Sequence, residues 1–152
     1  MDTIDILCVG EVLVDFIGHQ EGVLINETRD YHRYLGGSPT NVAMNSTRLG
    51  LNTIMVATVG NDGFGSYITE RLSSVGVNTN HLNVLENKST SVIFVSRSDG
   101  TPDFIPYRSA DCCIYEEQIS SEILSHTKIF HTTCFALSKN PAQKTILKKA
   151  QE

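Results

Sequence analysis

The hydrophobic and polar positions of this chain follow two alternating patterns. Continuous apolar runs occupy residues 4–9 (IDILCV) and 53–59 (TIMVATV), and a glycine directly follows each run. Short apolar runs that end at turn residues are typical of buried strands. Residues 39–50 and 64–75 instead carry apolar side chains at helical spacing. Strands and helices in alternation predict an α/β fold with buried parallel strands.

Both predicted helices have recognisable ends. For the first helix, we expect Ser38 as the N-cap, Pro39 at the first helical position and Gly50 as the stop. Its expected buried face consists of four residues: Val42, Ala43, Ser46 and Leu49. The second helix is expected to be capped by Asn61 or Asp62 and to end at Gly76. Its expected apolar face also has four members: Phe64, Ile68, Leu72 and Val75.

Two β-rich segments interrupt this alternation. Residues 12–35 begin with the strand-like VLVDFI and continue through mixed polar and apolar residues, which predict loops and one or two exposed strands. Residues 90–108 predict a hairpin, with SVIFV and PDFIPY as its strands and Ser98-Asp99-Gly100 as its turn.

The remaining residues resume the α/β pattern. A short helix is expected near 116–125, and a core strand at 128–136 (KIFHTTCFA). Asn140 and Pro141 repeat the pattern of a cap followed by proline and predict another helix. Four of its residues are expected to point inward: Ala142, Ile146, Leu147 and Ala150. This helix runs to Glu152 without a stop signal or a closing strand, so we expect the chain to be part of a larger protein.

Composition narrows the possible functions. The 152 residues suffice for one domain, and the net charge of −5 argues against a nucleic-acid binder. No apolar stretch approaches the roughly 20 residues that span a bilayer, and the acidic N-terminus does not resemble a signal peptide. The four cysteines lack C-x-x-C spacing and the five histidines show no companion pattern, so we expect no zinc site. These features predict a cytoplasmic protein with no membrane partner.

Asp15 is the first candidate for function. It interrupts an apolar run just after a buried strand, in GEVLVDFIG, where a carboxylate is unusual. Ligands of open α/β sheets bind at the carboxyl ends of strands, and a carboxylate there can accept hydrogen bonds from sugar hydroxyls. A solvent-facing residue on a strand that leaves the core would explain the same pattern.

Gly36 and Gly37 directly precede the first predicted helix, and Asn41 lies in its first turn. The glycines are explained either by a tight connection or by a ligand that approaches backbone N–H groups at the helix start. The segment lacks the lysine with which a P-loop binds phosphates. A neutral polyol therefore fits it better than a nucleotide phosphate does.

Tyr107 and Arg108 end the predicted hairpin. An arginine at a strand end is commonly solvated, but it can also hold a carboxylate or polar group of a small ligand in bidentate fashion.

Together these segments resemble the N-terminal half of the PfkB, or ribokinase-like, carbohydrate kinases. GGSPTNVAMNSTRLGLNTIMVATVGNDGFG is similar to the family's first signature. GEVLVDF, DFIPYRSAD and FHTTCFALS most resemble the fructokinase and 2-keto-3-deoxygluconate kinase branches.

The resemblance implies a doubly wound α/β/α sandwich with a small β-sheet lid. Residues 1–152 would form the N-terminal part of one kinase domain, with lid segments at about 12–35 and 90–108. It also implies a homodimer formed through the lid, and a set of sugar-binding residues: Asp15, Gly36, Gly37, Asn41 and, from the second lid segment, Tyr107 and Arg108.

The family's second signature, of the type D-T-x-G-A-G-D, does not occur in this chain. In the family it supplies the catalytic aspartate and an anion hole. The resemblance therefore implies an ATP-dependent, Mg²⁺-assisted sugar kinase whose catalytic residues lie C-terminal to this chain, with fructose as the leading acceptor. A 2-keto-3-deoxygluconate kinase, a ribokinase or nucleoside kinase, and a non-catalytic sugar-binding protein are the alternatives.

Overall fold

The computed structural model describes residues 3–152 and contains two four-stranded sheets. Sheet A is entirely parallel, and its strand order is β5-β4-β1-β8. Its members are β1 (Ile4–Val9), β4 (Thr53–Gly60), β5 (Asn78–Leu85) and β8 (Thr127–His131). The apolar runs that predicted β1 and β4 are therefore the two central strands, which explains why both lack polar alternation.

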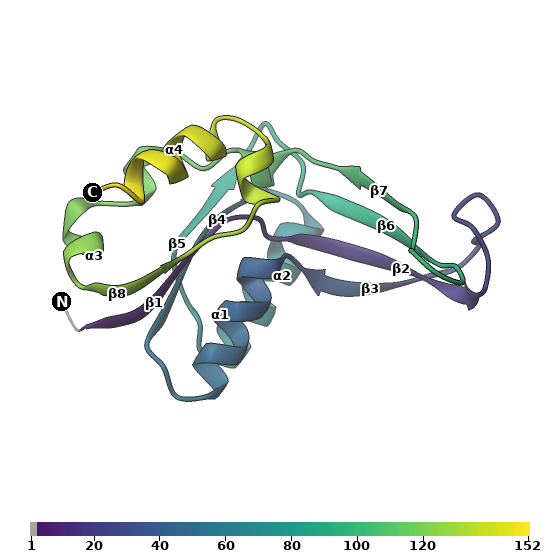
Figure 1. Cartoon of the computed structure of the whole chain (residues 1–152), viewed down its shortest axis with the longest axis horizontal. Helices are drawn as coiled ribbons and strands as arrows, with labels where there is room; N and C mark the ends of the chain where they lie inside the picture. Colours follow the sequence, from purple (N-terminus) through teal and green to yellow (C-terminus); the bar gives the residue numbers. More distant parts are fainter. Residues whose placement is uncertain (1–2) are drawn as a thin grey trace.

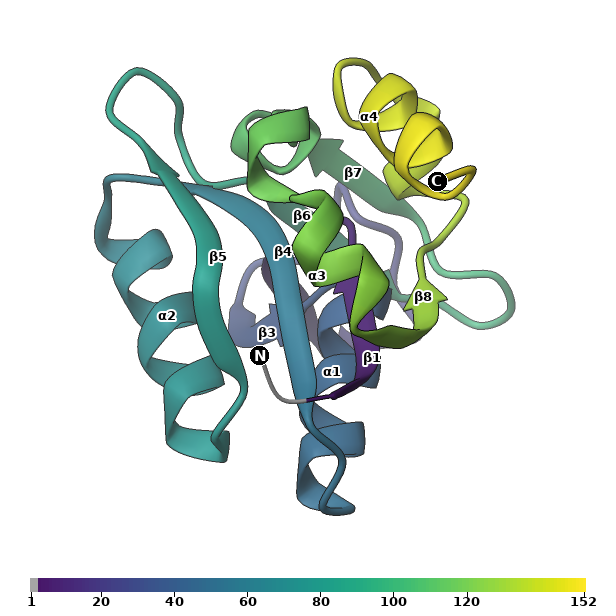
Figure 2. The same cartoon turned by 90° about the vertical axis from the view of Figure 1, so that its left-hand side faces the viewer.

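Helices cover both faces of sheet A (Figures 1 and 2). On one face lie α1 (Ser38–Arg48) and α2 (Gly63–Val75). The other face is covered by α3 and α4 and by short 3-10 turns. Their bounds are η1 (Ala110–Cys112), η2 (Glu116–Gln118), α3 (Ser121–Ser125), η3 (Ala136–Ser138) and α4 (Ala142–Lys149). The predicted α/β sandwich is thus confirmed as a three-layer arrangement.

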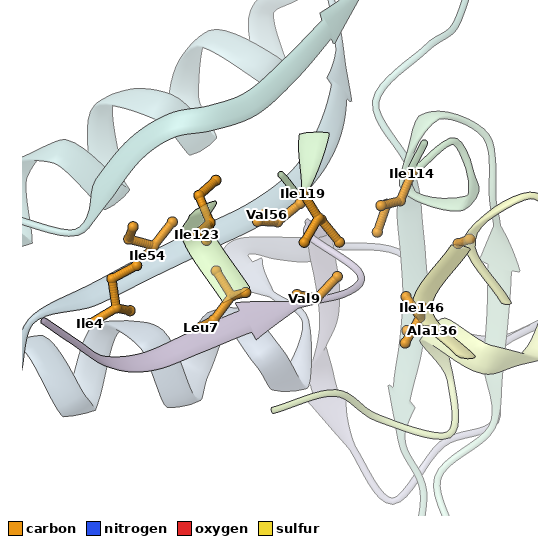
Figure 3. Packing of buried hydrophobic residues seen from close by; sticks show 11 residues of the cluster. Ile4, Leu7, Val9, Ile54, Val56, Ile114, Ile119, Ile123, Ala136 and Ile146 are labelled. Carbon is orange, nitrogen blue, oxygen red and sulfur yellow. The ribbon is translucent and has the colours of Figure 1, made fainter. Parts of the chain in front are cut away.

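Each face of sheet A has its own hydrophobic cluster. Figure 3 shows the first, in which Ile119 and Ile123 face residues of β1 and β4. The second cluster joins the same two strands to α1 and α2, with Ile68 and Leu72 of α2 completely buried. Burying a side chain of this size contributes about 1.5–3 kcal/mol, so these clusters hold the carboxyl ends of the strands in place.

Sheet B is built from the two β-rich segments. Its strands are β2 (Leu13–Glu21), β3 (Tyr31–Gly36), β6 (Val92–Arg97) and β7 (Phe104–Tyr107). They lie in the order β3-β2-β6-β7, with β2 and β6 parallel and the outer pairs antiparallel. Figure 1 shows this sheet extending away from sheet A. Segments about 80 residues apart therefore pair into one sheet, and the predicted hairpin is formed by β6 and β7.

Both predicted ends of α2 are correct, whereas for α1 the predicted stop at Gly50 is correct and the predicted N-cap is wrong. Asp62 caps α2 by accepting hydrogen bonds from the backbone N–H groups of Phe64 and Gly65, and Gly76 follows in the left-handed conformation. At α1, Gly37 is the N-cap residue and Ser38 lies inside the helix, because the Glu11 carboxylate accepts the Ser38 N–H and takes the place of a local cap.

The expected inward face of α1 also needs correction. Leu49 is 82% exposed, whereas Thr40 and Ala43 are completely buried. Thr40 Oγ1 donates a hydrogen bond to the Glu11 carbonyl, and this contact turns the row of Thr40 and Ala43 towards sheet A.

Three predictions for the last third of the chain were also wrong. The strand expected at 128–136 ends at His131, and residues 136–138 form η3. Pro141, not Asn140, is the N-cap residue of α4, and no side chain caps that helix. Leu147 and Ala150 are exposed, and Thr145 is buried in their place, because α4 packs through the row that contains Ala142 and Ile146. Within residues 3–152, no helix has the length and apolar character needed to cross a membrane.

Candidate functional site

The two faces of sheet B differ in chemistry. Paired residues of adjacent strands share a face, so the register places Asp15, Tyr34 and Ile93 on one side and Phe16, Arg33 and Phe94 on the other. The first side, which we call the pocket face, borders a cavity of about 510 Å³. The second, which we call the aromatic face, borders another of about 700 Å³.

We call the cavity on the pocket face the Asp15 pocket. Its lining combines polar groups from the loop after β1 and the start of α1 with apolar groups from sheet B. The lining residues are Glu11, Leu13, Asp15, Gly37, Ser38, Asn41, Ile93, Val95, Thr101, Pro102, Phe104 and Phe135. An apolar concave surface with a few convergent polar groups is the usual form of a small-molecule site.

Asp15 is half-buried on β2, and its carboxylate accepts no hydrogen bond from residues 3–152. Burial raises the pKa of this carboxyl above its ordinary value of 3.8, because desolvation disfavours the charged form. The carboxylate therefore keeps its full capacity to accept hydrogen bonds from a ligand.

The glycine doublet preserves this arrangement. A Cβ on Gly36 would clash with the Asp15 carboxylate and with Leu13. Gly37 has a φ of 104°, which side-chain-bearing residues rarely adopt, and a Cβ there would clash with the Glu11 carbonyl. The absent side chains thus first make room for the protein's own Asp15 and Glu11, and Gly37 is also exposed to the pocket.

Glu11 was missed by the sequence analysis. It follows β1 and is 2% exposed, yet no cation pairs with it among the described residues. Its carboxylate accepts hydrogen bonds from Ser38 N–H at 3.1 Å and from Thr133 Oγ1 at 2.7 Å. Glu11 thereby joins the loops that follow the neighbouring strands β1 and β8 to the start of α1. Its signal was a charged residue within the otherwise apolar GEVLV, the same signal that singled out Asp15.

The other predicted site residues divide between the two cavities. Asn41 is exposed and borders the Asp15 pocket, where its amide can both donate and accept hydrogen bonds. Tyr107 and Arg108 line the cavity on the aromatic face instead. Tyr107 is paired with Val92 in the register and is 60% exposed. The structure therefore brings Asp15, Gly37 and Asn41 together but does not place Tyr107 beside them.

Arg108 is buried, with only 3% of its side chain exposed. Its guanidinium forms an ion pair of 2.6 Å with Asp111, which is itself completely buried. Arg108 Nη1 also donates to the carbonyl oxygen of Phe135 at 3.0 Å and to Ser138 Oγ, and the guanidinium lies 4.0 Å from the centre of the Phe135 ring. The possibility that Arg108 is simply solvated is therefore wrong.

The charges around the Asp15 pocket have one sign. Two carboxylates line it, and no lysine, arginine or histidine is among its described lining residues. Nowhere in 3–152 do three histidine, cysteine or acidic side chains gather as they would around a metal ion. These residues do not form a phosphate cradle, so they do not fit the phosphates of ATP. They fit a neutral ligand rich in hydroxyl groups, because carboxylate and amide groups can accept its hydrogen bonds.

Comparisons with known proteins give the chain its family. Residues 3–152 match the model of the pfkB family carbohydrate kinases. An ATP-dependent 6-phosphofructokinase of Thermoanaerobacterium thermosaccharolyticum is 37% identical over 93% of this chain and 44% of its own length. A probable fructokinase of Arabidopsis thaliana is 32% identical over 93% of this chain and 42% of its own.

Solved structures of sugar kinases also resemble this chain. The fructokinase of Halothermothrix orenii superposes with a TM-score of 0.92 at 34% identity, over 97% of this chain and 52% of that one. A sugar kinase from Pyrococcus horikoshii in complex with ATP gives 0.90 at 33% identity, over 96% of this chain and 48% of that one. The chain spans about half the length of these relatives, and it belongs to the pfkB family of carbohydrate kinases.

Proposed function

We propose that this chain forms the sugar-binding part of an ATP-dependent, fructokinase-like sugar kinase. The observation that carries the proposal is the Asp15 pocket, in which an unpartnered carboxylate, Gly37 and Asn41 converge between the start of α1 and sheet B. In this proposal residues 1–152 are the N-terminal part of one kinase domain, and sheet B is the lid over the sugar.

A neutral sugar is the substrate class that the pocket favours. The relatives include a 6-phosphofructokinase, whose substrate would bring a phosphate group, and 2-keto-3-deoxygluconate would bring a carboxylate. Either anion would enter a pocket with two carboxylates and no base among its described lining residues, where like charges repel. We therefore place fructose ahead of both, and ahead of ribose or a nucleoside because the relatives include several fructokinases.

The residues of this chain would bind and orient the sugar. Asp15 would accept hydrogen bonds from sugar hydroxyls, Asn41 would both donate and accept, and Gly36 and Gly37 would leave room for the sugar beside the backbone. Arg108 borders the pocket only through Phe135, and a direct contact of Tyr107 with the sugar stays a prediction. ATP and Mg²⁺ would supply the phosphoryl group and neutralise its charge, held by residues outside this chain together with the catalytic aspartate.

A homodimer through sheet B is part of the same proposal. The aromatic face exposes Ile105 and Tyr107 beside a cluster in which Phe94 packs against Phe16, Tyr31 and Tyr107. A second copy would bury this apolar surface. The cytoplasm is the expected location, and it stays a prediction.

The test is a coupled assay of ADP formation in the protein that carries this chain. Fructose, fructose 6-phosphate, 2-keto-3-deoxygluconate and ribose are each supplied with ATP and Mg²⁺. We expect kcat/KM for fructose to exceed that for either anionic sugar at least tenfold. Preferred turnover of an anionic sugar would contradict the substrate class. If calorimetry shows fructose binding and no ADP forms, the alternative of a non-catalytic sugar-binding protein is correct.

A further inference from the structure

We propose that Phe135 is a sugar-contacting wall of the Asp15 pocket, and that Arg108 serves this pocket by holding Phe135 in position. This inference rests on the proposed function and assigns a binding role to Phe135, which no sequence pattern singled out. It also gives Arg108 a positioning role in place of direct contact with the sugar.

The first step is the burial of the Arg108 guanidinium and its pairing with Asp111. Nε donates to Asp111 Oδ2 at 2.8 Å, Nη2 lies 2.6 Å from the same oxygen, and Nη1 donates to Phe135 O and Ser138 Oγ. Nε and Nη1 therefore donate hydrogen bonds within the protein, whereas Nη2 forms no hydrogen bond and is buried beside the Asp111 carboxylate. With 3% of its side chain exposed, Arg108 offers no accessible donor to a sugar.

The second step is the position of Phe135 between this guanidinium and the pocket. The guanidinium carbon lies 4.0 Å from the centre of the ring, and Phe135 also lines the Asp15 pocket. A cation over an aromatic face contributes about 0.5–2 kcal/mol. Arg108 thus fixes the ring through this contact and the backbone through the hydrogen bond to the Phe135 carbonyl.

The third step is the anchoring of the same loop from its other side. Thr133 Oγ1 donates to Glu11 Oε2 at 2.7 Å and accepts a hydrogen bond from Ala136 N–H at 3.3 Å. Glu11 itself lines the pocket and holds the start of α1. Residues 133–136 are therefore held by Glu11 on one side and by Arg108 on the other, with the Phe135 ring between these two anchors and beside the pocket.

The ring adds to the apolar part of the pocket lining, which lies beside the polar groups. Leu13, Ile93 and Phe104 supply the rest of this apolar wall from sheet B, and Phe135 supplies the part that comes from the end of sheet A. Such a wall would pack against the C–H groups of a sugar while Asp15 and Asn41 bind its hydroxyls. It would also separate the sugar from the nearest guanidinium, which keeps the pocket free of positive charge.

A double-mutant cycle tests this assignment. Fructose affinity is measured by calorimetry in the wild type, Phe135→Ala, Arg108→Ala and the double variant. We expect each single variant to lose at least fivefold in affinity and the double variant to lose no more than Phe135→Ala alone, because Arg108 acts through the ring. Losses that multiply would show that Arg108 contacts the sugar directly and would overturn the positioning role. Arg97→Ala, which removes an exposed arginine of β6, is the matched control.

A second variant avoids the risk that Arg108→Ala fails to fold. Arg108→Met with Asp111→Leu replaces both charges by apolar side chains, which is often tolerated where loss of one partner is not. The thioether that this variant introduces can pack on the Phe135 ring in place of the guanidinium. We expect the variant to keep its fructose affinity within about threefold of the wild type; a larger loss in a folded variant would contradict the proposal.

The outcome also separates this inference from the proposed function. If the wild type binds no fructose, the proposed function fails. If the wild type binds fructose and Phe135→Ala binds it equally well, only the role of Phe135 is refuted.

Discussion

Asp15 and Asp111 are two aspartates withdrawn from solvent, and the protein treats them in opposite ways. Asp111 is completely buried and fully engaged, with an ion pair to Arg108 and a hydrogen bond from Ser91 Oγ. Asp15 is half-buried and has no donor among the described residues, so burial raises its pKa. The engaged carboxylate contributes structure, whereas the unengaged one costs stability and remains available to a ligand.

Removing the partner of a buried charge should cause the largest loss in the free energy of unfolding. Asp111→Ala leaves the Arg108 guanidinium buried without a counterion, and we expect a loss of about 3–5 kcal/mol in the free energy of unfolding. Urea denaturation measures it. Glu21→Ala, which removes the carboxylate of an exposed ion pair with Arg97, should change the unfolding free energy little. Equal losses in the two variants would show that the Asp111 pair has no special structural role.

A side chain in the space that Asp15 occupies should lower the free energy of unfolding by an intermediate amount. Gly36→Ala places a Cβ against the Asp15 carboxylate, and we expect a loss of about 1–3 kcal/mol in unfolding free energy, together with loss of fructose binding. Gly63→Ala is the matched control, because nothing lies within 4 Å of the added Cβ. A Gly36→Ala protein as stable as the control would mean that Asp15 has room to move away.

Neutralising Asp15 should change the stability of the fold less than the two changes above, and should raise it. A carboxyl whose pKa is raised on folding binds its proton more tightly in the folded state, so the folded protein loses stability as the pH rises from 3.8 through the raised pKa. Asp15→Asn removes that loss. We expect a higher melting temperature than the wild type at pH 7 and no difference at a pH below 3.8. A lower melting temperature at pH 7 would mean that the ionised carboxylate has a stabilising partner.

The sequence predicted correctly those features that depend on residues close to one another in the chain. The cap and stop of α2 were predicted correctly because Asp62 and Gly76 act on residues within a few positions of themselves. Local patterns likewise identified β1 and β4 of sheet A and the pair of β6 and β7 of sheet B, but they did not predict β5.

The predictions that were wrong concern residues whose partners lie far away in the sequence. Ser38 is not the N-cap because its N–H is bound by Glu11, which lies 27 residues earlier, and the burial of Arg108 depends on Phe135, 27 residues later. Such partners are brought together only by the packing of sheets A and B, which no local pattern encodes. The sequence therefore indicated the candidate site through single unusual residues, Asp15 and the glycines, whereas the segment of Phe135 was predicted as a strand and given no role in the site.

The most direct test of the central claim is the affinity of the protein for fructose in the wild type and in Asp15→Asn, titrated by calorimetry at pH 7. The account predicts measurable binding in the wild type and a loss of at least tenfold in the variant, because an amide replaces an ionised acceptor in the same space. Equal affinities in two folded proteins would contradict it and would remove the Asp15 pocket as the sugar site.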